Sequence, residues 1–325
     1  MGTRRFVTIR PAPTVTRKYV NHHLDSTRWR VFEPRDDDIV VSTSYKSGTT
    51  WMQQILHLLV FRGDPEAPPT PQASPWLDAR FHGPLAEVAA NLTSQSHRRF
   101  IKSHLPLDGL PYYPQVQYVV VARDPRDVFM SLWNHYANYT DSMLDRLNDM
   151  EGWSGEPFPR APGDVRRLWR DWMTRGWFEW ESEGWPFWSN LHHTGSWWPW
   201  RDVPNVLLVH YSDLLADPSG QIRRIADYLG FELSADGLEA IVRFSSFDTM
   251  RAVVRERADE QMREVFKGGA EAFFYKGTNG RWREVLSADD LVLYEEAKQR
   301  VLPPDCADWL ERGWIGIEAD EQGTR

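Results

Sequence analysis

A lysine, a glycine and several small hydroxyl residues follow one another in the segment S-T-S-Y-K-S-G-T-T-W, residues 42–51. An apolar run precedes this segment and a helix-period pattern follows it, so a strand-to-helix turn is predicted here. The free N–H groups and positive dipole end of a helix attract anions, Lys46 adds a charge, and Gly48 lets the backbone approach a ligand closely. An ordinary helix cap at Ser47 or Thr49 explains the same residues equally well, and the ATP/GTP signature G-x-x-x-x-G-K-S/T is absent.

Lys102 and His104 stand two residues apart at the end of a second apolar run, in R-R-F-I-K-S-H-L-P, residues 98–106. On a strand this spacing places both side chains on one side of the sheet, at the end where ligands bind in open α/β sheets. A histidine there could remove a proton from a hydroxyl group, because its ordinary pKa lies near neutral pH. A histidine of this kind is more often a hydrogen-bonded structural residue, so the pair taken alone is only a candidate.

Arg123 directly follows a third apolar run, and Ser131 lies two helical turns further along, in Q-Y-V-V-V-A-R-D-P-R-D-V-F-M-S, residues 117–131. A guanidinium at this point could bind a phosphate through two hydrogen bonds, assisted by the serine hydroxyl. The alternative is an ion pair between Arg123 and Asp127 beside a capped helix. Arg126 is interpreted as a solvated charge.

A glycine-punctuated basic loop, F-F-Y-K-G-T-N-G-R-W-R, occupies residues 273–283 and contains Lys276, Arg281 and Arg283. It could close over an anion, or it could be a charged, solvated loop. The loop is notable because the chain as a whole is acidic, with 38 Lys and Arg against 46 Asp and Glu and a net charge of −8. Any anion site must therefore be a local basic island, and general binding of nucleic acids is not expected.

Short apolar runs alternate with helix-period segments along the 325-residue chain. The predicted strands are 38–42, 99–102, 118–122 and 206–210, and the predicted helices are 49–61, 125–139, 163–181, 219–229, 234–243 and 287–301. The V-V-V core of the third strand is typical of a strand buried on both faces, as in a parallel sheet. We therefore expect an α/β fold with a central parallel sheet flanked by helices. A single domain, 1–325, is expected, with an N-terminal extension over about residues 1–30 and a flexible tail at 318–325.

The composition is that of an ordinary globular protein, with 41% hydrophobic and 26% charged residues. The N-terminus lacks the apolar core of a signal peptide, and no apolar run approaches the roughly 18 residues of a membrane span. Cys306 is the one cysteine, which fits a reducing compartment, so a cytoplasmic protein is expected. Ten of the 17 tryptophans fall between Trp153 and Trp200. Most are expected in the core, with the wall of a pocket as the lesser alternative.

Six segments together, in chain order over about residues 38–283, resemble the cytosolic-type sulfotransferase family. Y-K-S-G-T-T-W is similar to the family's 5′-phosphosulfate loop, R-F-I-K-S-H-L-P to its lysine–histidine strand and V-V-A-R-D-P-R-D-V-F-M-S to its 3′-phosphate motif. The other three are H-Y-S-D-L-L-A-D-P, S-S-F-D-T-M and Y-K-G-T-N-G-R-W-R. The family transfers a sulfuryl group from 3′-phosphoadenosine 5′-phosphosulfate (PAPS) to an acceptor and releases the bisphosphate PAP. The resemblance also implies a phosphosulfate-binding loop of the P-loop-kinase type.

The resemblance implies catalytic roles for three residues. Lys46 would bind the bridging oxygen and stabilise the leaving phosphate, and Lys102 would neutralise charge on the sulfuryl oxygens. His104 would take the proton of the acceptor, a hydroxyl in preference to an amine. Sulfuryl transfer, like phosphoryl transfer, depends on in-line placement and electrostatic stabilisation. No metal is expected, since the sequence contains no compact cluster of ligand residues.

The resemblance also implies which residues would bind PAPS. The loop would hold the 5′-phosphate, an arginine–serine pair and a later basic loop would hold the 3′-phosphate, and aromatic and hydroxyl side chains would line the nucleoside. These residues are Lys46, Ser47, Gly48, Thr49 and Thr50 in the loop, Arg123, Ser131, Lys276 and Gly277 around the 3′-phosphate, and Trp51, Tyr211, Ser245 and Phe247 at the nucleoside.

Two departures from the family pattern bear on cofactor binding. Tyr45 replaces a proline that would stiffen the loop. Tyr275 stands where an arginine would contact the 3′-phosphate. Lys276, Arg281 or Arg255 could supply the missing charge, or PAPS could bind more weakly.

Two other functions stay open. A small-molecule kinase would bind ATP and Mg²⁺, although the G-K-S/T signature and an evident Mg²⁺ carboxylate are missing. An inactive protein could bind PAPS or another nucleotide without turnover. The segment at 283–292 does not match the family's dimer motif, so dimerisation of that kind is not expected.

The acceptor is expected to be a phenol, an alcohol, a lipid or a glycolipid. Phe81, His82 and part of Trp153–Trp200 are expected to form an aromatic, apolar pocket for it. The segment R-R-F-I-K-S-H-L-P-L-D-G-L-P resembles bacterial family members that act on small molecules or glycolipids.

Overall fold

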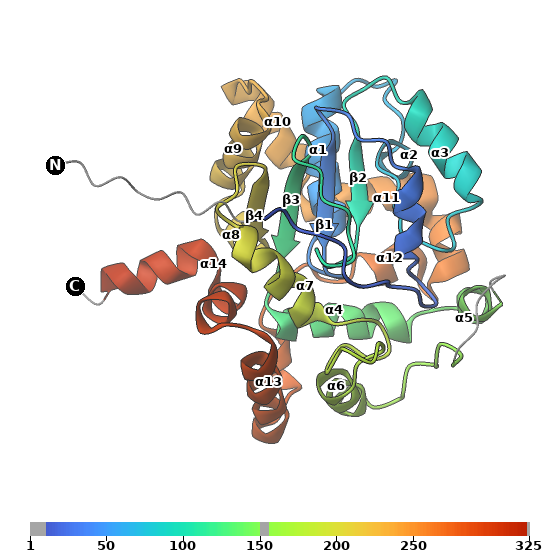
Figure 1. The fold of residues 1–325 in the computed structure, drawn as a ribbon, viewed down its shortest axis with the longest axis vertical. Helices are drawn as coiled ribbons and strands as arrows, with labels where there is room; N and C mark the ends of the chain where they lie inside the picture. Colours follow the sequence, from blue (N-terminus) through green and yellow to red (C-terminus); the bar gives the residue numbers. More distant parts are fainter. Residues whose placement is uncertain (1–10, 150–155, 324–325) are drawn as a thin grey trace.

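Four parallel strands form the central sheet of the computed structural model, which describes residues 11–149 and 156–323 (Figure 1). The strands are β1 (Ile39–Thr43), β2 (Phe100–Ser103), β3 (Gln117–Ala122) and β4 (Val206–His210), in the spatial order β2-β1-β3-β4. Val41 of β1 pairs with Lys102 and with Val119, so the carboxyl ends of β1, β2 and β3 lie side by side. All four predicted strands are confirmed, with ends that shift by one residue at most.

Helices cover both faces of the sheet, and further helices cover the carboxyl ends of its strands. Their bounds are α1 Thr49–Phe61, α2 Thr70–Ala73, α3 Leu85–Ser94, α4 Pro125–Ala137, α5 Asp141–Asn148, α6 Val165–Thr174, α7 Asn190–Trp197, α8 Tyr211–Ala216, α9 Pro218–Leu229, α10 Ala235–Phe244, α11 Phe247–Val265, α12 Gly269–Phe273, α13 Ala288–Val301 and α14 Pro304–Gly323. Short 3-10 helices occupy Ser26–Val31, Trp198–Trp200 and Arg281–Glu284. The predicted α/β architecture is confirmed.

Strand β3 shows how the sheet separates two apolar cores. Tyr118, Val120 and Ala122 belong to a core that also contains residues of α4, α6, α7 and α13. Val119 and Val121 belong to a second core, with residues of α1, α9 and α10. Successive side chains of a strand point to opposite faces, so the V-V-V run is buried on both sides, as predicted.

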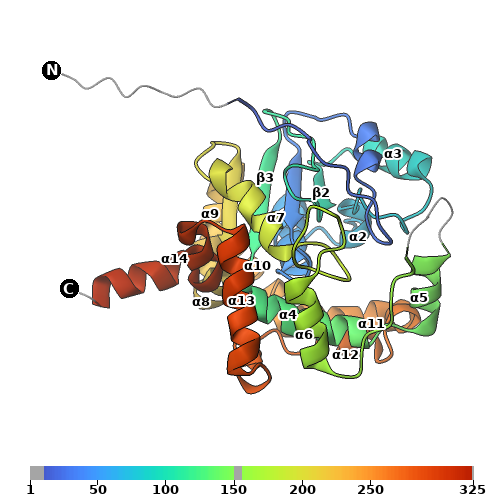
Figure 2. The ribbon, with the colours of Figure 1, turned by 60° about the horizontal axis from the view of Figure 1, so that its bottom comes forward.

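Helices α4, α11 and α12 run across the carboxyl ends of the strands (Figures 1 and 2). Helix α4 begins directly after β3, because Asp124 caps its N-terminus by accepting a hydrogen bond from the Arg126 N–H, and Pro125 suits its first turn. Helix α12 contacts both α4 and α11. The predicted site residues therefore lie between these helices and the strand ends.

One predicted helix is much shorter in the structure, and several helices, α11 among them, were not predicted. The helix expected over 163–181 covers only Val165–Thr174, and an irregular segment with Gly176 and a left-handed Gly184 follows it. Helix α11 was not predicted, because Met250 is the one residue that it buries among its 19 and its sequence has no apolar period.

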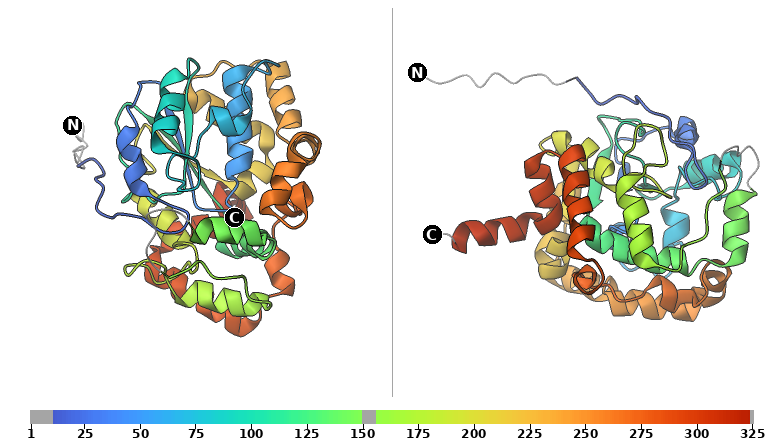
Figure 3. Two further views of the ribbon diagram at one scale, coloured as in Figure 1. Left: turned by 90° about the vertical axis from the view of Figure 1, so that its right-hand side faces the viewer. Right: turned by 90° about the horizontal axis from the view of Figure 1, so that it is seen from below.

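Two terminal segments that the structure describes, residues 19–29 and 318–323, are more structured than expected. Tyr19, Leu24 and Trp29, within the predicted N-terminal extension, are buried in the main core. Helix α14 continues to Gly323, so residues 318–323 of the expected flexible tail are helical. Its backbone bends at Gly313 (φ 71°), and its second half projects from the body of the protein (Figure 3).

The tryptophan-rich segment is mainly core, as its predominant interpretation predicted. Trp169, Trp172 and Trp197 are fully buried, and Trp198 is nearly so. Trp153 lies outside the described residues.

Candidate active site

A cavity of about 780 Å³ lies at the carboxyl ends of β1, β2 and β3. This volume is within the range of small-molecule sites. The predicted site residues that line it are Lys46, Gly48, Thr49, Thr50, Trp51, Lys102, His104, Arg123, Ser131, Tyr211, Ser245, Phe247, Lys276 and Gly277. Ser47 is the exception among the predicted residues, because its side chain is buried and does not reach the cavity. Segments far apart in the sequence thus meet at one cavity.

The loop between β1 and α1 has the backbone of a ligand cradle. Lys46 (φ 61°) and Gly48 (φ 108°) both adopt left-handed conformations. Gly48 is the N-cap residue of α1 and no side chain caps the helix, so the alternative of a Ser47 or Thr49 cap is wrong. The first N–H groups of α1 therefore lack the usual side-chain acceptor. A Cβ atom at position 48 would lie 2.8 Å from Cδ2 of Tyr211, so only glycine fits there.

Tyr45 anchors this loop to the tryptophan-rich segment. Its hydroxyl donates a hydrogen bond to the Trp188 carbonyl and accepts one from the Trp172 indole N–H, both at 2.8 Å. Its ring packs edge-on against the Trp188 ring, with 5.0 Å between centroids. The residue that replaces the family's proline is therefore held by buried hydrogen bonds.

His104 has the geometry of a general base. Its Nδ1 lies 2.7 Å from the Thr43 carbonyl oxygen and donates to it, so Nε2 carries the free lone pair. Burial, followed by the nearby Lys102 ammonium, holds the pKa of His104 well below its usual value. The imidazole is therefore neutral at physiological pH. Buried Asp78 fixes its position by accepting a hydrogen bond from the His104 backbone N–H (3.1 Å) and another from the Trp76 indole (2.8 Å).

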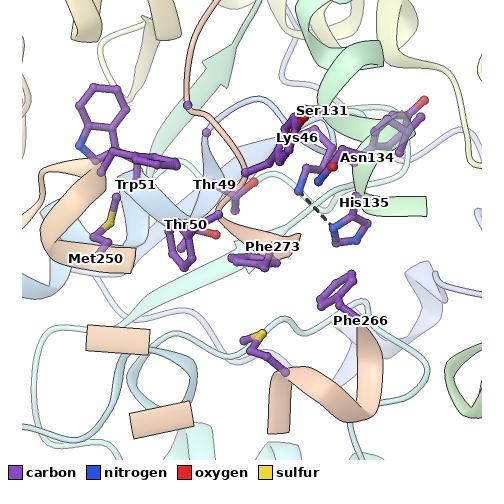
Figure 4. A pocket seen from close by; sticks show the side chains of 18 of the residues that line it. Lys46, Thr49, Thr50, Trp51, Ser131, Asn134, His135, Met250, Phe266 and Phe273 are labelled. Atoms are coloured by element: carbon purple, nitrogen blue, oxygen red, sulfur yellow. Dashed lines mark hydrogen bonds between the residues drawn. The ribbon is translucent and has the colours of Figure 1, made fainter. Parts of the chain in front are cut away.

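Lys46 contacts a residue that the sequence interpretation missed. Its ammonium donates to Nδ1 of His135 at 3.2 Å and lies 5.1 Å from the centre of the Phe273 ring (Figure 4). Burial, followed by the charges of Arg123 and Lys102, lowers the pKa of Lys46 to about 7. Burial and the Lys46 charge hold the pKa of His135 well below its usual value. His135 stands one helical turn after Ser131, and this spacing was the available signal.

Lys102 points into the same cavity from the end of β2. Its ammonium lies 4.2 Å from the centre of the Trp76 ring. Burial lowers its pKa to about 8. Two lysines with lowered pKa values therefore lie in the same cavity as a neutral histidine. Such a group of shifted pKa values is typical of active sites.

Arg123 is held by the basic loop and not by Asp127. Its guanidinium donates to the Asn279 side-chain oxygen (2.8 and 3.1 Å) and to the Thr278 carbonyl (3.1 Å), and it stacks 4.1 Å above the Tyr211 ring. Asp127 instead accepts a hydrogen bond from the Gly280 N–H at 2.6 Å. The predicted alternative of an Arg123–Asp127 pair is therefore wrong.

Arg126 is not a solvated charge. Its side chain is 15% exposed, forms an ion pair with Asp124 at 2.8 Å and stacks 4.4 Å from the Trp282 ring. The reason is that Trp282, at the end of the basic loop, packs back onto the start of α4. Arg126 thus fixes this loop against the helix and does not line the cavity.

Aromatic rings line the cavity next to the loop. The rings of Trp51 and Tyr211 meet edge-on with 5.5 Å between centroids, and Tyr211 donates a hydrogen bond to the Gly277 carbonyl at 3.1 Å. Phe247 packs against Gly277, where a Cβ atom would approach its ring to 2.6 Å. The Trp51 indole nitrogen is buried, and no described residue provides it with a hydrogen-bond partner. These features fit a planar heterocycle that supplies an acceptor for the indole.

The other end of the cavity is apolar and aromatic. Phe81 and His82, which were predicted for the acceptor pocket, line it, and Trp188 does so from the tryptophan-rich segment. Phe187 also lines it from that segment, and the residues that sequence interpretation missed here are His23, Trp76, Tyr139, Met143, Met262, Phe266 and Phe273. They come from several separate segments and form no local sequence motif.

The described part of the chain contains neither a cluster of metal ligands nor a membrane-spanning helix. Within residues 11–149 and 156–323, no group of three or more His, Cys, Asp or Glu side chains is placed to hold a metal ion. Over the same ranges, no helix has the length and apolar character required to cross a membrane.

Comparison with known proteins identifies the family. Residues 36–302 match the family model described as "Sulfotransferase domain". A glycolipid sulfotransferase of Mycobacterium bovis is 33% identical over 308 residues, which cover 90% of this chain and 94% of that protein. Two crystal structures have the same fold. Retinol dehydratase in complex with retinol and PAP has a TM-score of 0.65 at 24% identity, covering 86% of this chain and 87% of that one. Mouse sulfotransferase SULT7A1 complexed with PAP has a TM-score of 0.61 at 20% identity, covering 86% and 90%. The chain belongs to the sulfotransferase family.

Proposed function

We propose that this protein transfers the sulfuryl group of PAPS to a hydroxyl group of an apolar or aromatic small molecule. The observation that carries the proposal is one continuous cavity with a cationic cradle at one end, an apolar wall at the other and a neutral histidine on its lining. PAPS carries a sulfuryl group that is activated on its 5′-phosphate. Trp51, Tyr211 and Phe247 would hold its nucleoside, and the N–H groups of the loop from Lys46 to Thr50 would bind its 5′-phosphate.

The proposed chemistry uses three side chains of the cavity. His104 Nε2 accepts the proton of the acceptor hydroxyl, and the oxygen so freed forms the new S–O bond as the bond to the phosphate breaks. Lys46 and Lys102 place positive charge where negative charge accumulates, on the leaving phosphate and the sulfuryl oxygens. Lys46 would then give up its hydrogen bond to His135 and bind the leaving phosphate. The proton ends on His104 and the electron pair on the phosphate oxygen, so charge and atoms balance.

The acceptor end supports a hydrophobic alcohol or phenol. Phe81, Phe187, Phe266 and Met143 offer a wall with little hydrogen-bonding capacity. The mycobacterial relative is named as a glycolipid sulfotransferase. We therefore propose an acceptor with a lipid-like or aromatic body. A cytoplasmic location is also proposed, in keeping with a buried, unpaired Cys306.

The test is a product assay with the wild-type protein. It is incubated with PAPS and a panel of a simple phenol, a long-chain alcohol, a sterol and a glycolipid, and products are identified by mass spectrometry. A sulfated acceptor and an equal amount of PAP are expected. A parallel incubation with ATP and Mg²⁺ tests the kinase alternative, and a phosphorylated product there would overturn the proposal. Tight PAP binding without turnover of any acceptor would instead favour an inactive nucleotide-binding protein.

A further inference from the structure

The loop at residues 275–281 brings a second arginine to the nucleotide end of the cavity. Gly277 (φ 66°) and Gly280 (φ 84°) turn this loop back on itself, and Arg281 begins the short helix that follows. Asn279 secures the turn, because its oxygen accepts from Arg123 and its NH₂ donates to the Ser212 hydroxyl at 3.0 Å. Arg281 therefore lines the same cavity as Arg123 from a loop that the protein holds in place.

Arg123 and Arg281 form a pair of like charges that lacks a counter-charge. Over residues 11–149 and 156–323, neither guanidinium forms an ion pair with a carboxylate. The Arg281 Nε is buried and has no hydrogen-bond partner among the described residues. Burial and then the Arg123 charge lower the pKa of Arg281. Two partly buried guanidiniums without an acid between them fit a bound anion of high charge.

Asp127 is the carboxylate that bears on this pair, but it does not neutralise it. Its oxygen accepts the Gly280 N–H at 2.6 Å, which supports the turn of the loop. Burial, followed by the neighbouring Asp124 charge, raises its pKa to about 6. Asp127 thus serves the backbone of the loop, and the Arg281 guanidinium is left for a ligand.

We infer that Arg281, together with Arg123, binds the 3′-phosphate and thereby makes the site selective for 3′-phosphorylated nucleotides. The inference rests on the proposed function. If the loop from Lys46 to Thr50 takes the 5′ end of the nucleotide, the pair of arginines remains for the second phosphate.

The other basic candidates are less suited. Lys276 lines the cavity but is exposed. Arg255 does not line it, is 67% exposed and lies 3.8 Å from Glu271. The Arg281 guanidinium lies 5.2 Å from the centre of the Tyr275 ring, so its charge is next to the position where the family pattern has an arginine.

The experiment compares two ligands that differ only in the 3′-phosphate, PAP and AMP, by calorimetric titration of the full chain. Wild type is expected to prefer PAP strongly. Arg281→Gln should weaken PAP binding about 10- to 100-fold, the value of one or two hydrogen bonds to a charged group, while AMP binding changes less than about threefold. Arg283→Gln is the matched control, because Arg283 is exposed, stacks on Trp282 and does not line the cavity. It should leave both affinities unchanged.

A second substitution distinguishes the loss of the positive charge from a general disturbance of folding. Tyr275→Arg in the Arg281→Gln background restores a guanidinium beside the same site, so it should recover most of the PAP preference. If Arg281→Gln keeps the wild-type ratio of PAP to AMP affinity, or if it weakens both ligands equally, the inference is wrong. If the wild-type protein binds no PAP at all, the proposed function itself is wrong. That result differs from the two Arg281→Gln results that would contradict only the inference.

Discussion

The nucleotide end of the cavity takes its charges from a few contiguous segments, whereas the acceptor end takes single apolar side chains from many. The loop after β1, the residue after β3 and the 275–281 loop supply the basic groups, such as Lys46, Arg123 and Arg281. At the other end, Phe81, Trp188 and Phe266 come from separate stretches of the chain. The difference indicates that anion binding depends on fixed backbone geometry, while acceptor binding depends on how the helices pack. His104 and the two lysines connect the ends chemically.

The largest expected effect tests whether the two ends work independently before the reaction. His104→Ala should lower kcat about 10²- to 10⁴-fold, because it removes the group that accepts the acceptor proton. PAP affinity, measured by titration, should stay within about threefold of wild type, since the histidine contributes no charge there. His97→Ala, outside the cavity, is the control. Unchanged turnover in His104→Ala would remove His104 from the mechanism.

A change of pH should affect the nucleotide end more than the acceptor end. In the free protein the pKa values of Lys46 and Lys102 are about 7 and about 8, and both ammonium groups must be charged to attract an anion. Below pH 7 both lysines are protonated. Above it, Lys46 must first regain its proton, so PAP affinity should fall about tenfold per pH unit above pH 7. Lys102 should contribute less, because it faces the sulfuryl group, which PAP lacks. Calorimetry in two buffers of different ionisation enthalpy should record proton uptake, and binding of a neutral apolar alcohol should change little.

The His135 contact sharpens the pH prediction. His135→Phe removes the hydrogen-bond acceptor of the Lys46 ammonium, so the pKa of Lys46 should fall further and the loss of PAP affinity should begin about one pH unit lower. His135→Asn keeps an acceptor and should restore the wild-type profile. A profile that is identical in all three proteins would show that His135 does not influence Lys46.

The smallest expected effect concerns the connection between the ends. Tyr45→Phe leaves the Trp172 N–H and the Trp188 carbonyl without their shared hydroxyl, which should lower the free energy of unfolding by about 1–3 kcal/mol. The same variant should weaken both PAP and acceptor binding by a few-fold, because Tyr45 precedes the loop and Trp188 lines the acceptor end. Urea titration and the two binding assays measure these changes. An effect confined to one ligand would mean that the ends are separable at this point.

The sequence predicted most residues of the nucleotide end of the cavity and few residues of the acceptor end. Lys102 lies at the end of β2, and His104 and Arg123 directly follow β2 and β3. Lys46 stands three residues after β1, so the convergence of all four follows from a parallel sheet. His135 was missed although its spacing from Ser131 signals a shared helix face. The acceptor wall was largely out of reach, because Met262 lies in the last turn of α11 and Phe266 directly follows this helix, whose polar sequence gave no apolar period. Tertiary packing, not local pattern, assembles that wall.

The Tyr45 anchor has a consequence for changing the acceptor repertoire by laboratory evolution. The acceptor wall contains positions of two kinds. Phe81 and Met143 can be randomised with the phosphate-binding loop intact, because neither contacts Tyr45 through a hydrogen bond. The Trp188 ring packs edge-on against the Tyr45 ring, so a library at position 188 would alter the affinity for the sulfuryl donor along with acceptor preference. New acceptor specificities should therefore be reached more readily by substitution of Phe81 and Met143.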